Sequence, residues 1–398
     1  MSKVGYRFRF YPTAEQAREL ARTFGAVRYV YNFALRLRTD SYKAGKTINY
    51  NASSAAITAL KKQPEHAWLK EISSVPPHQA LRHLQSAFRM FFTHQSRYPK
   101  FKKKRGKQRA EYTRSGFRWE ARTKTLTVVK LGKLKIRWSR QFQSAPSTVT
   151  ITKDCADRYF IALTLDETFT LLPKTQQRVG IDVGINRLAT LSTGERVANP
   201  RLTLRYERRL THAHRVLSRR QKGSGRWQRM RLRVGKIAAR IADTRADHLH
   251  KLTTDWVRRF DEICLEDLHV NGMLRNRHVA KHVADASFGN ISRKVAYKCK
   301  WYGKKLLTVD RYFPSSKRCH VCGYIVESLR LKERVWSCPE CGSVHDRDEN
   351  AAKNIEHAAG HAVIDARGGR VRRVKAAALK RNARRTVNRS KSRALHDA

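Results

Sequence analysis

The sequence predicts a multidomain α+β protein: a small antiparallel β-barrel with a helical insertion, followed by an α/β segment that contains a cysteine-rich ribbon. Apolar residues recur at helical spacing between residues 13 and 107, and at every second position from about residue 110 to 165. Two Cys-x-x-Cys pairs stand 15 residues apart near the C-terminal end. A chain of 398 residues is long enough for two or three domains with their own cores.

The charge balance narrows the class of partner. Lys+Arg 85 against Asp+Glu 32 gives a net charge of +53 and a pI near 10.9. A folded chain tolerates so much like charge when its working state includes a polyanion. A membrane surface is the alternative, but the sequence has no long apolar run, and residues 1–10 lack the apolar core of a signal peptide. We therefore expect an intracellular protein that binds nucleic acid.

The N-terminal part combines one strand with several helices. A short alternating strand at 4–11 is followed by a capping signal, Thr13 with Gln16. A second helix is expected after the Pro-Pro pair at 76–77, and shorter helices are expected at 51–72. The apolar face of the first helix consists of Leu20, Phe24, Val27, Tyr31 and Leu35.

Antiparallel strands follow this helical block. The first strand is expected to complete their small barrel, with the helices inserted into it, and 166–177 is expected to be a linker. The alternating segments lie at 126–128, 134–138, 149–151 and 160–165.

The C-terminal part mixes strands with long helices. Its longest helical stretch is broken at 223–225 and strongly basic, since only Glu207 opposes its Arg and Lys residues before Asp243. The tail at 367–393 is so basic that we expect it to be disordered until it binds nucleic acid. The predicted elements are strands at 178–184, 188–192 and 262–266, and helices at 203–257, at 286–305 and from Asn350 onward.

Four cysteines have the spacing of a structural zinc site. Four thiolates close a tetrahedral site and leave no open position for water, so this zinc is expected to stabilise a local fold. His320 and His345 are expected to be bystanders. In a reducing compartment, the scattered Cys155, Cys264 and Cys299 are expected to be small core residues. The predicted zinc ligands are Cys319, Cys322, Cys338 and Cys341.

Three carboxylates share one kind of position. Asp182, Glu266 and Asp348 each lie at the end of a predicted strand or the start of a helix. Carboxylates placed there can converge on two divalent ions about 4 Å apart, which suit phosphodiester hydrolysis. Hard oxygen ligands favour Mg²⁺ or Mn²⁺. Gly180 and Gly184 are expected to let a nucleic-acid backbone approach the strand of Asp182.

Each acid also has a plainer explanation. A single Asp after a strand is more often a turn or cap residue, and Glu266 with Asp267 has the character of a surface pair. Asp346 or Asp348 is suited to cap the helix that follows. We favour Asp348 as the metal ligand and keep Asp346 as a capping or supporting residue.

The ordered motifs resemble the TnpB proteins encoded by insertion sequences, relatives of type V CRISPR effectors. The resemblance extends from Tyr11 to Ile355 and includes the Tyr-Val-Tyr-Asn segment at 29–32. The motifs that carry it are Gly180-Ile-Asp-Val-Gly184, Leu265-Glu-Asp-Leu268, Phe313-Pro-Ser-Ser-Lys317, the two cysteine pairs, and Asp346-Arg-Asp-Glu-Asn-Ala-Ala-Lys-Asn-Ile355.

The resemblance implies an RNA-guided DNA endonuclease of a transposable element, with Asp182, Glu266 and Asp348 as its catalytic triad. The implied cofactors are structural zinc, catalytic magnesium and a guide RNA, and the implied substrate is double-stranded DNA beside a short motif. The implied location is prokaryotic, cytoplasmic and nucleoid-associated. The implied domains are an oligonucleotide-binding-type wedge barrel at 1–12 and 108–170, a helical recognition lobe at 13–107, a RuvC-like RNase H domain at 178–310 and 345–358, a zinc ribbon at 311–344, and a basic tail at 359–398.

Basic residues in the loop before the barrel and in the long helices are the candidates for backbone contacts. Tyr98, Phe101 and Trp227 are candidates for base stacking, although core packing is the commoner role of an aromatic residue. The candidate contact residues are Lys100, Lys102, Lys103, Lys104, Arg105, Arg219, Arg220, Lys222 and Arg229.

Two other functions remain open. A DDE-type transposase would use the same fold and metals, but usually carries a helix-turn-helix ahead of its catalytic domain. A non-catalytic nucleic-acid-binding regulator would need only the charge and the ribbon. The oligomeric state is also open, because a single nuclease site can cut two strands in turn.

Overall fold

The computed structural model describes residues 2–104, 106–330 and 332–360, which form two compact units. The first unit comprises the described residues up to Leu171 together with Arg201–His248, and the second comprises Leu172–Pro200 and the described residues from Leu249 onward. The predicted tail beyond residue 360 and the candidate contact residue Arg105 lie outside the described residues. No helix in the described part of the chain is long and apolar enough to span a membrane.

The helices of the first unit follow strand β1 and form a core of their own. Thr13 and Gln16 make the predicted capping box at the start of the first helix, α1. Early α1 residues, Leu20 and Phe24, pack into the core of the sheets, whereas its residues from Ala26 onward pack with the other helices. The elements are β1 (Ser2–Phe10), α1 (Ala14–Lys43), α2 (Tyr50–Leu60), η1 (Pro64–His66), α3 (Trp68–Glu71) and α4 (Val75–Phe92).

Two antiparallel sheets share one core in this unit. The larger has the order β2-β7-β8-β1-β6 and the smaller the order β3-β4-β5. In the described residues no pairing joins β2 to β6, so the larger sheet is open and the predicted barrel is not closed. The strands are β2 (Gln108–Thr113), β3 (Phe117–Glu120), β4 (Thr125–Val128), β5 (Gly132–Lys133), β6 (Ile136–Arg137), β7 (Thr148–Lys153) and β8 (Tyr159–Glu167), with η2 (Arg114–Gly116) after β2.

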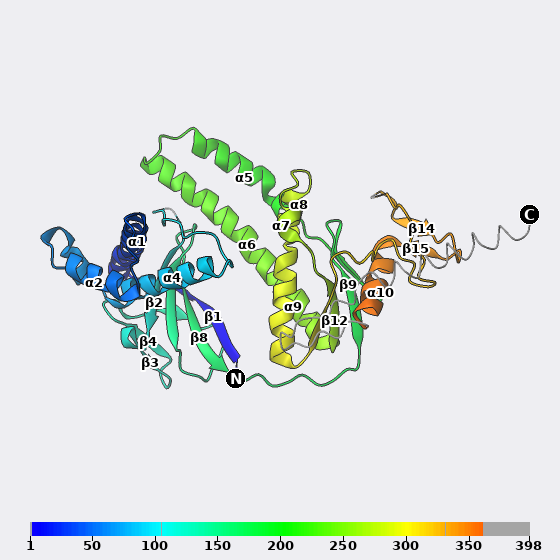
Figure 1. Ribbon diagram of the computed structural model, residues 1–398, viewed down its shortest axis with the longest axis horizontal. Helices are drawn as coiled ribbons and strands as arrows, with labels where there is room; N and C mark the ends of the chain where they lie inside the picture. Colours follow the sequence, from blue (N-terminus) through cyan, green and yellow to red (C-terminus); the bar gives the residue numbers. More distant parts are fainter. Residues whose placement is uncertain (1, 105, 331, 361–398) are drawn as a thin grey trace, which may run out of the picture. The chain divides into compact units, whose positions relative to one another are not determined.

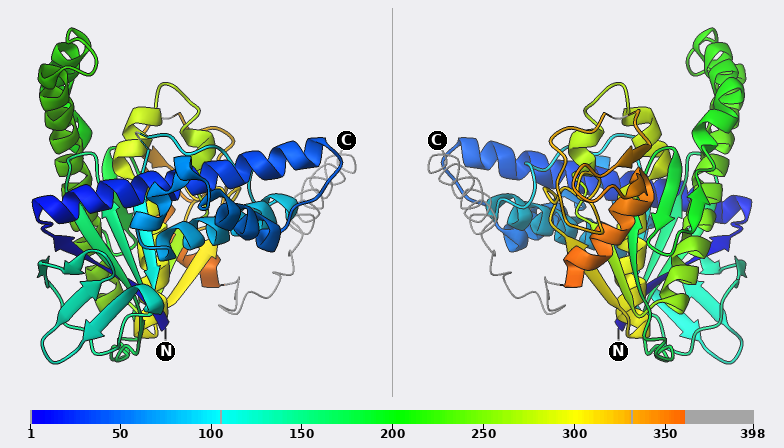
Figure 2. Two further views of the ribbon diagram at one scale, coloured as in Figure 1. Left: turned by 90° about the vertical axis from the view of Figure 1, so that its left-hand side faces the viewer. Right: turned by 90° about the vertical axis from the view of Figure 1, so that its right-hand side faces the viewer.

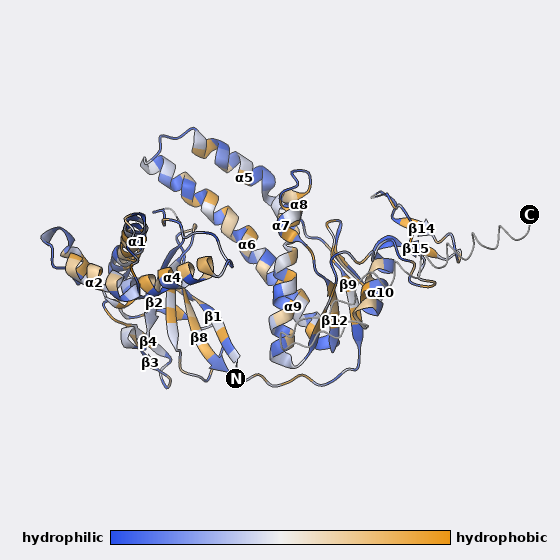
Figure 3. Ribbon diagram, viewed as in Figure 1, coloured by the Kyte–Doolittle hydropathy of each residue, from blue (hydrophilic) through white to orange (hydrophobic). Residues whose placement is uncertain are grey.

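The predicted basic helical stretch is a hairpin of α5 (Leu202–Ser218) and α6 (Gly225–Arg259) (Figure 1). Figure 3 shows hydrophilic residues interleaved with apolar ones along both helices. The hairpin packs closely on the β7–β8 turn of the first unit at Gly235. A Cβ atom at this position would lie 2.0 Å from the carbonyl oxygen of Cys155, so only glycine fits there. The domain predicted at 178–310 therefore spans both compact units.

The second unit is a sheet with helices on both faces. Its order is β11-β10-β9-β12-β13, with β9, β12 and β13 parallel and the remaining pairs antiparallel. Alternate strand residues face opposite ways, as expected for a buried parallel sheet. Ile263 and Leu265 pack with α9, whereas Cys264 packs with α10.

The boundaries of these elements position the candidate site. The predicted helix from Asn350 begins three residues earlier, at Arg347. The strands are β9 (Arg178–Asp182), β10 (Arg187–Leu191), β11 (Arg196–Ala198), β12 (Glu262–Glu266), β13 (Lys305–Val309), β14 (Val335–Ser337) and β15 (Val344–Asp346). The helices are α7 (Val270–Met273), α8 (Ala280–Ala286), α9 (Phe288–Tyr302) and α10 (Arg347–Gly360).

Candidate catalytic and zinc sites

Sheet register brings two of the three predicted carboxylates to one edge. Strands β9 and β12 are parallel neighbours, and Ile181 is paired with Leu265. Asp182 and Glu266 are the next residues along each strand, so both lie at the carboxyl ends of adjacent strands. Neighbouring strands lie about 4.8 Å apart, which puts these side chains within reach of each other.

The third carboxylate comes from a helix that packs directly on β9. Asp348 is the second residue of α10. At Gly180 a Cβ atom would lie 2.0 Å from the carbonyl oxygen of Ala352, so only glycine lets α10 approach this closely. The expectation that Gly180 admits a nucleic-acid backbone is therefore wrong, because α10 fills that space. At Gly184 a Cβ atom would meet the carbonyl oxygen of Arg187 at 3.0 Å.

The three carboxylates influence one another electrostatically. Burial, followed by the charges of Glu266 and Asp348, raises the pKa of Asp182 to about 8, against the opposing charges of Arg347 and Arg334. Burial also raises the pKa of Glu266. Like charges in a partly dry site disfavour ionisation, and a bound cation would reverse this effect. The donor set therefore suits a hard divalent ion.

Two neighbours hold the carboxylates in separate positions. The Ser315 hydroxyl donates a hydrogen bond to Glu266 Oε1. Arg334 Nη1 lies 3.3 Å from Asp348 Oδ1. Among the described residues, only the four cysteines are already gathered as a group of three or more potential ligands around one point.

Asp346 has a different role from Asp348. Its Oδ1 accepts hydrogen bonds from the N–H groups of Asp348 and Glu349, each at 3.1 Å, and so caps α10. Its Oδ2 pairs with Arg196 at 3.0 Å and with Arg187 at 3.3 Å. Burial opposes ionisation here, but the Glu349 N–H group and Arg187 outweigh it and lower the pKa of Asp346. Asp346 therefore fixes the start of the helix that carries Asp348.

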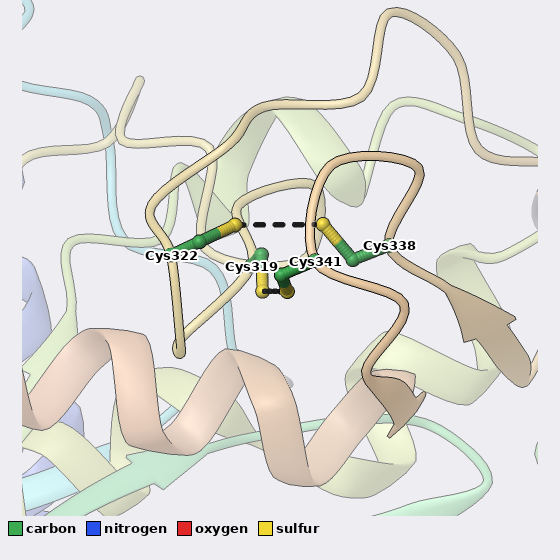
Figure 4. Close-up of side chains that lie close together, drawn as sticks. All are labelled: Cys319, Cys322, Cys338 and Cys341. Carbon is green, nitrogen blue, oxygen red and sulfur yellow. Dashed lines mark hydrogen bonds between the residues drawn. The ribbon is translucent and has the colours of Figure 1, made fainter.

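The four predicted zinc ligands lie together in the ribbon (Figure 4). Their sulfur atoms all lie within 4.8 Å of one another, with 3.5 Å between Cys322 and Cys338 and 3.7 Å between Cys319 and Cys341. Tetrahedral Zn–S bonds of about 2.3 Å require sulfur atoms about 3.8 Å apart, so the group fits zinc. Neither predicted bystander belongs to this group, although the Nε2 atom of the buried His345 lies 3.1 Å from Cys319 Sγ.

The remaining cysteines differ from one another. Cys264 and Cys299 are buried, as expected for small core residues, but Cys155 is exposed and that expectation is wrong for it. Cys155 lies in the turn between β7 and β8, where its carbonyl group packs against Gly235 and its thiol lies 3.6 Å from the Gly235 carbonyl oxygen.

Two asparagines of α10, for which the sequence predicted no role, connect this helix to the ribbon. Asn350 and Asn354 are both buried, and their Nδ2 groups donate to the carbonyl oxygen of Arg318 at 2.7 and 2.5 Å. Their spacing of four residues on a helix was the available signal, since it puts both amides on one face. The Ser315 hydroxyl had no comparable signal.

Most of the basic candidates are exposed, with one exception. The ammonium of Lys102 lies 3.8 Å from the ring centre of Tyr31, and burial lowers the pKa of Lys102 to about 8. Asn32 bonds both the N–H and the carbonyl of Lys102, so this residue ties its loop to α1. The exposed candidates are Lys100, Lys103, Lys104, Arg219, Arg220, Lys222 and Arg229.

The α5–α6 hairpin contains clefts lined by basic side chains. Residues 201–240 hold fourteen Arg and Lys residues against one acid, Glu207. The smaller cleft, of about 450 Å³, includes the predicted Arg220 and Arg229. The larger, of about 540 Å³, is lined by Tyr206, Arg208, Arg209, His212, Arg233, Lys236, Ile237 and Arg240.

Family models match three parts of the chain. Residues 161–277 match a model described as a probable transposase, OrfB_IS605, and residues 288–355 match a Cas12f1-like TNB domain. Residues 1–47 match a helix-turn-helix model of the same OrfB family. Within 2–47, however, the structure has one strand and the single uninterrupted helix α1, drawn in dark blue in Figure 2.

Two curated relatives cover most of the chain. A protein of Streptomyces pristinaespiralis named "Putative RNA-guided DNA endonuclease" is 48% identical over 358 residues, which are 89% of this chain and 88% of the relative. "Putative RNA-guided DNA endonuclease InsQ" of Escherichia coli (strain K12) is 32% identical over 375 residues, covering 90% of this chain and 92% of the relative.

One solved structure has a similar fold. It is titled a complex of Cas12f1 with sgRNA and target DNA, and it matches with a TM-score of 0.58 at 12% identity. The match covers 89% of this chain and 98% of that one. At this identity the likeness concerns the fold alone.

Proposed function

The chain belongs to the OrfB family of IS605-type elements, which includes the TnpB proteins, and we propose that it is an RNA-guided DNA endonuclease that cuts guide-complementary DNA beside a short motif. The observation that carries this proposal is the register of β9 and β12, which brings Asp182 and Glu266 to one sheet edge below the helix that bears Asp348. The names of the two curated relatives support it.

In this proposal the second unit is a RuvC-like nuclease of RNase H type, and Cys319–Cys341 forms its zinc ribbon. The first unit supplies an oligonucleotide-binding-type wedge, built as an open pair of sheets, and a helical recognition lobe. The mixed sheet of the second unit, covered by helices on both faces, supports the nuclease assignment.

Asp182, Glu266 and Asp348 would hold Mg²⁺, and the four cysteines would hold zinc. Divalent ions in such sites activate a water molecule and stabilise the leaving oxygen of a phosphodiester. Burial keeps Asp182 and Glu266 partly dry, which strengthens their interaction with any cation. Asp346 caps α10 and so fixes the backbone from which Asp348 projects.

The basic hairpin and the exposed lysines of 100–104 would bind nucleic-acid backbones. None of Arg208, Arg209 and Arg233, which line the larger cleft, is paired with a carboxylate of the described residues. Unpaired guanidinium groups are available for phosphates, and such binding weakens steeply with salt. Base pairing with a guide would then supply the sequence choice.

The observations favour this function over the two alternatives. The matched family model is described as a probable transposase, and this description is consistent with the alternative of a strand-joining enzyme. The continuous α1 argues against a helix-turn-helix that reads transposon ends. A non-catalytic regulator would not need three acids whose charges act on one another at the sheet edge.

The test begins with the RNA that the protein carries. We expect the full chain, purified through a high-salt wash, to retain one discrete RNA with a common scaffold and a short variable 3′ end. That complex should then cut duplex DNA that matches the variable segment, in the presence of Mg²⁺. Heterogeneous RNA, or no RNA, together with no guided cleavage would contradict the proposal and favour the regulator.

A further inference from the structure

Ser315 is a buried hydroxyl bonded to one of the proposed metal ligands. It is 6% exposed and donates to Glu266 Oε1. Ser315 lies between β13 and Cys319, in the Phe313–Lys317 motif. The proposed nuclease mechanism assigns no role to this motif. The bond occupies one carboxylate oxygen and leaves the other, Oε2, without a hydrogen-bond partner among the described residues.

The backbone around Ser315 is clamped by α10. Asn354 Nδ2 donates to the carbonyl oxygen of Ser315 at 2.9 Å and to that of Arg318 at 2.5 Å. One turn earlier, Asn350 Nδ2 donates to the same Arg318 carbonyl at 2.7 Å, and Asn350 Oδ1 accepts the His320 N–H group at 3.0 Å. Both asparagines are at most 3% exposed, so these bonds form in a dry environment where they are strong.

A segment of six residues therefore makes three connections. At Ser315 it touches the proposed metal ligand Glu266, at Arg318 and His320 it is bonded to α10, and at Cys319 it enters the zinc site. The same α10 carries Asp348. All of these residues belong to the second unit, so the connections lie within one compact body.

We propose that Ser315 is a positioning residue for metal binding: its hydroxyl fixes the carboxylate of Glu266 so that Oε2 is presented to the divalent ion, and the zinc ribbon with α10 holds the hydroxyl in place. This inference rests on the proposed function. A free glutamate side chain loses rotamer entropy when it is immobilised, and a hydrogen bond that already holds it reduces that loss on metal binding. Partners of metal ligands typically change metal affinity by about 10- to 100-fold when they are removed.

The neighbouring serine provides a matched control. Ser316 is partly buried in the same motif and makes no side-chain hydrogen bond among those of the described residues. Ser315→Ala removes the hydroxyl, Ser315→Thr retains one, and Ser316→Ala makes the same chemical change without touching Glu266. Zinc content, measured for each variant, reports whether the ribbon has kept its metal.

The experiment measures Mn²⁺ binding by calorimetry, using the full chain with its copurified RNA. We expect Ser315→Ala to bind Mn²⁺ about 10-fold or more weakly, and Ser315→Thr and Ser316→Ala to stay within about 2-fold of the unchanged protein. Zinc content should stay the same in all three. Equal affinity of Ser315→Ala and Ser316→Ala would overturn the proposal. So would equal losses in Ser315→Ala and Ser315→Thr, because the hydroxyl would then not be the cause.

The unchanged protein and one further variant, Glu266→Gln, separate this inference from the proposed function. If neither the unchanged protein nor Glu266→Gln shows a Mn²⁺ site at the carboxylates, the metal assignment itself fails. If Glu266→Gln loses the site while Ser315→Ala keeps it, the nuclease site stands and only the role of Ser315 is rejected.

Discussion

The zinc ribbon and the acidic site differ in how far each is assembled by the protein alone. The four sulfur atoms of the ribbon already lie within 4.8 Å of one another. The carboxylates of Asp182, Glu266 and Asp348 come from three elements and are held by separate partners, Ser315 and Arg334. Thiols are neutral when protonated and can lie together, whereas carboxylates repel one another in a dry site. With zinc bound, the four-cysteine site would stabilise the fold, whereas the acidic site lowers the stability of the fold as long as no cation is bound.

The largest expected effect is the loss of cleavage when the acidic site is disrupted. Asp182→Asn replaces one of the three proposed metal-binding carboxylates by a neutral amide, so guided cleavage should fall by about 10³-fold or more. RNA binding should change little, because Asp182 lies in the second unit whereas the basic clefts of the hairpin are lined by residues of the first. The measurement is single-turnover cleavage at saturating Mg²⁺. Asp267→Asn, which alters an exposed carboxylate paired with Arg311 beside Glu266, should cleave normally. Equal rates for both variants would contradict the catalytic assignment.

The next prediction breaks the ribbon instead. Cys338→Ser should release the zinc and lower both thermal stability and cleavage, because zinc binding contributes folding free energy on the order of 10 kcal/mol in small domains. The measurements are metal content and Tm. Cys155→Ser, at the exposed cysteine outside the ribbon, should keep its zinc. A Cys338→Ser protein of unchanged Tm but no activity would mean that the zinc acts in the chemistry as well.

A third prediction compares two aspartates of the same unit whose pKa values move in opposite directions. Asp261 forms an ion pair with Lys304, whose side chain is 2% exposed, and accepts the N–H groups of Thr175 and Gln176. The Lys304 hydrogen bond lowers the pKa of Asp261 to about 2. Asp261→Asn should lower the free energy of unfolding by about 3 kcal/mol, because it leaves the buried ammonium of Lys304 without its counter-charge. Asp182→Asn should raise Tm in buffer without Mg²⁺.

The pH dependence of stability follows from these directions. The Asp261 contribution is present above its ordinary pKa of 3.8 and is lost as the pH falls towards about 2. Asp182 acts in the opposite sense, because the unfolded chain ionises first and the folded state is disfavoured as the pH rises from 3.8 to about 8. The gain from Asp182→Asn should therefore grow over that range. A Tm difference that does not vary with pH would contradict the burial of Asp182.

Local signals in the sequence were sufficient for the ribbon and the helix starts. Cys319 and Cys341 are close along the chain, so spacing alone predicts a shared ion, and the Thr13 capping box lies within one turn. Whether the predicted barrel closes could not be inferred from such local signals. Strand β6 is only two residues long, Ile136–Arg137, and alternation of side chains does not reveal whether a strand end finds a partner.

Long-range contacts decided the parts of the site that the sequence did not reveal. The space beside Gly180 is filled by the backbone of Ala352, from the other end of the unit, so a glycine that looked suited to a ligand serves helix packing. The separate roles of Asp346 and Asp348 depend on the first turn of α10 and on Arg196. Neither the helix packing at Gly180 nor the division of roles between Asp346 and Asp348 can be predicted from the periodicity or spacing of residues in the sequence.

The smallest expected effect sharpens the contrast between the two sites. Arg334 belongs to the ribbon and forms an ion pair with Asp348. Its positive charge would therefore compete with Mg²⁺ for the Asp348 carboxylate. Its side chain is 50% exposed, and exposed ion pairs contribute only about 0.2–1 kcal/mol. Arg334→Ala should therefore lower the Mg²⁺ concentration for half-maximal cleavage by at most about five-fold. Arg330→Ala removes the same charge from an exposed ribbon residue that contacts the Glu333 carboxylate through its backbone N–H group and whose guanidinium has no carboxylate partner among the described residues, so it should have no such effect. The difference should shrink at high salt, which screens exposed charges. A higher Mg²⁺ requirement in Arg334→Ala would instead mean that this arginine helps to assemble the acidic site.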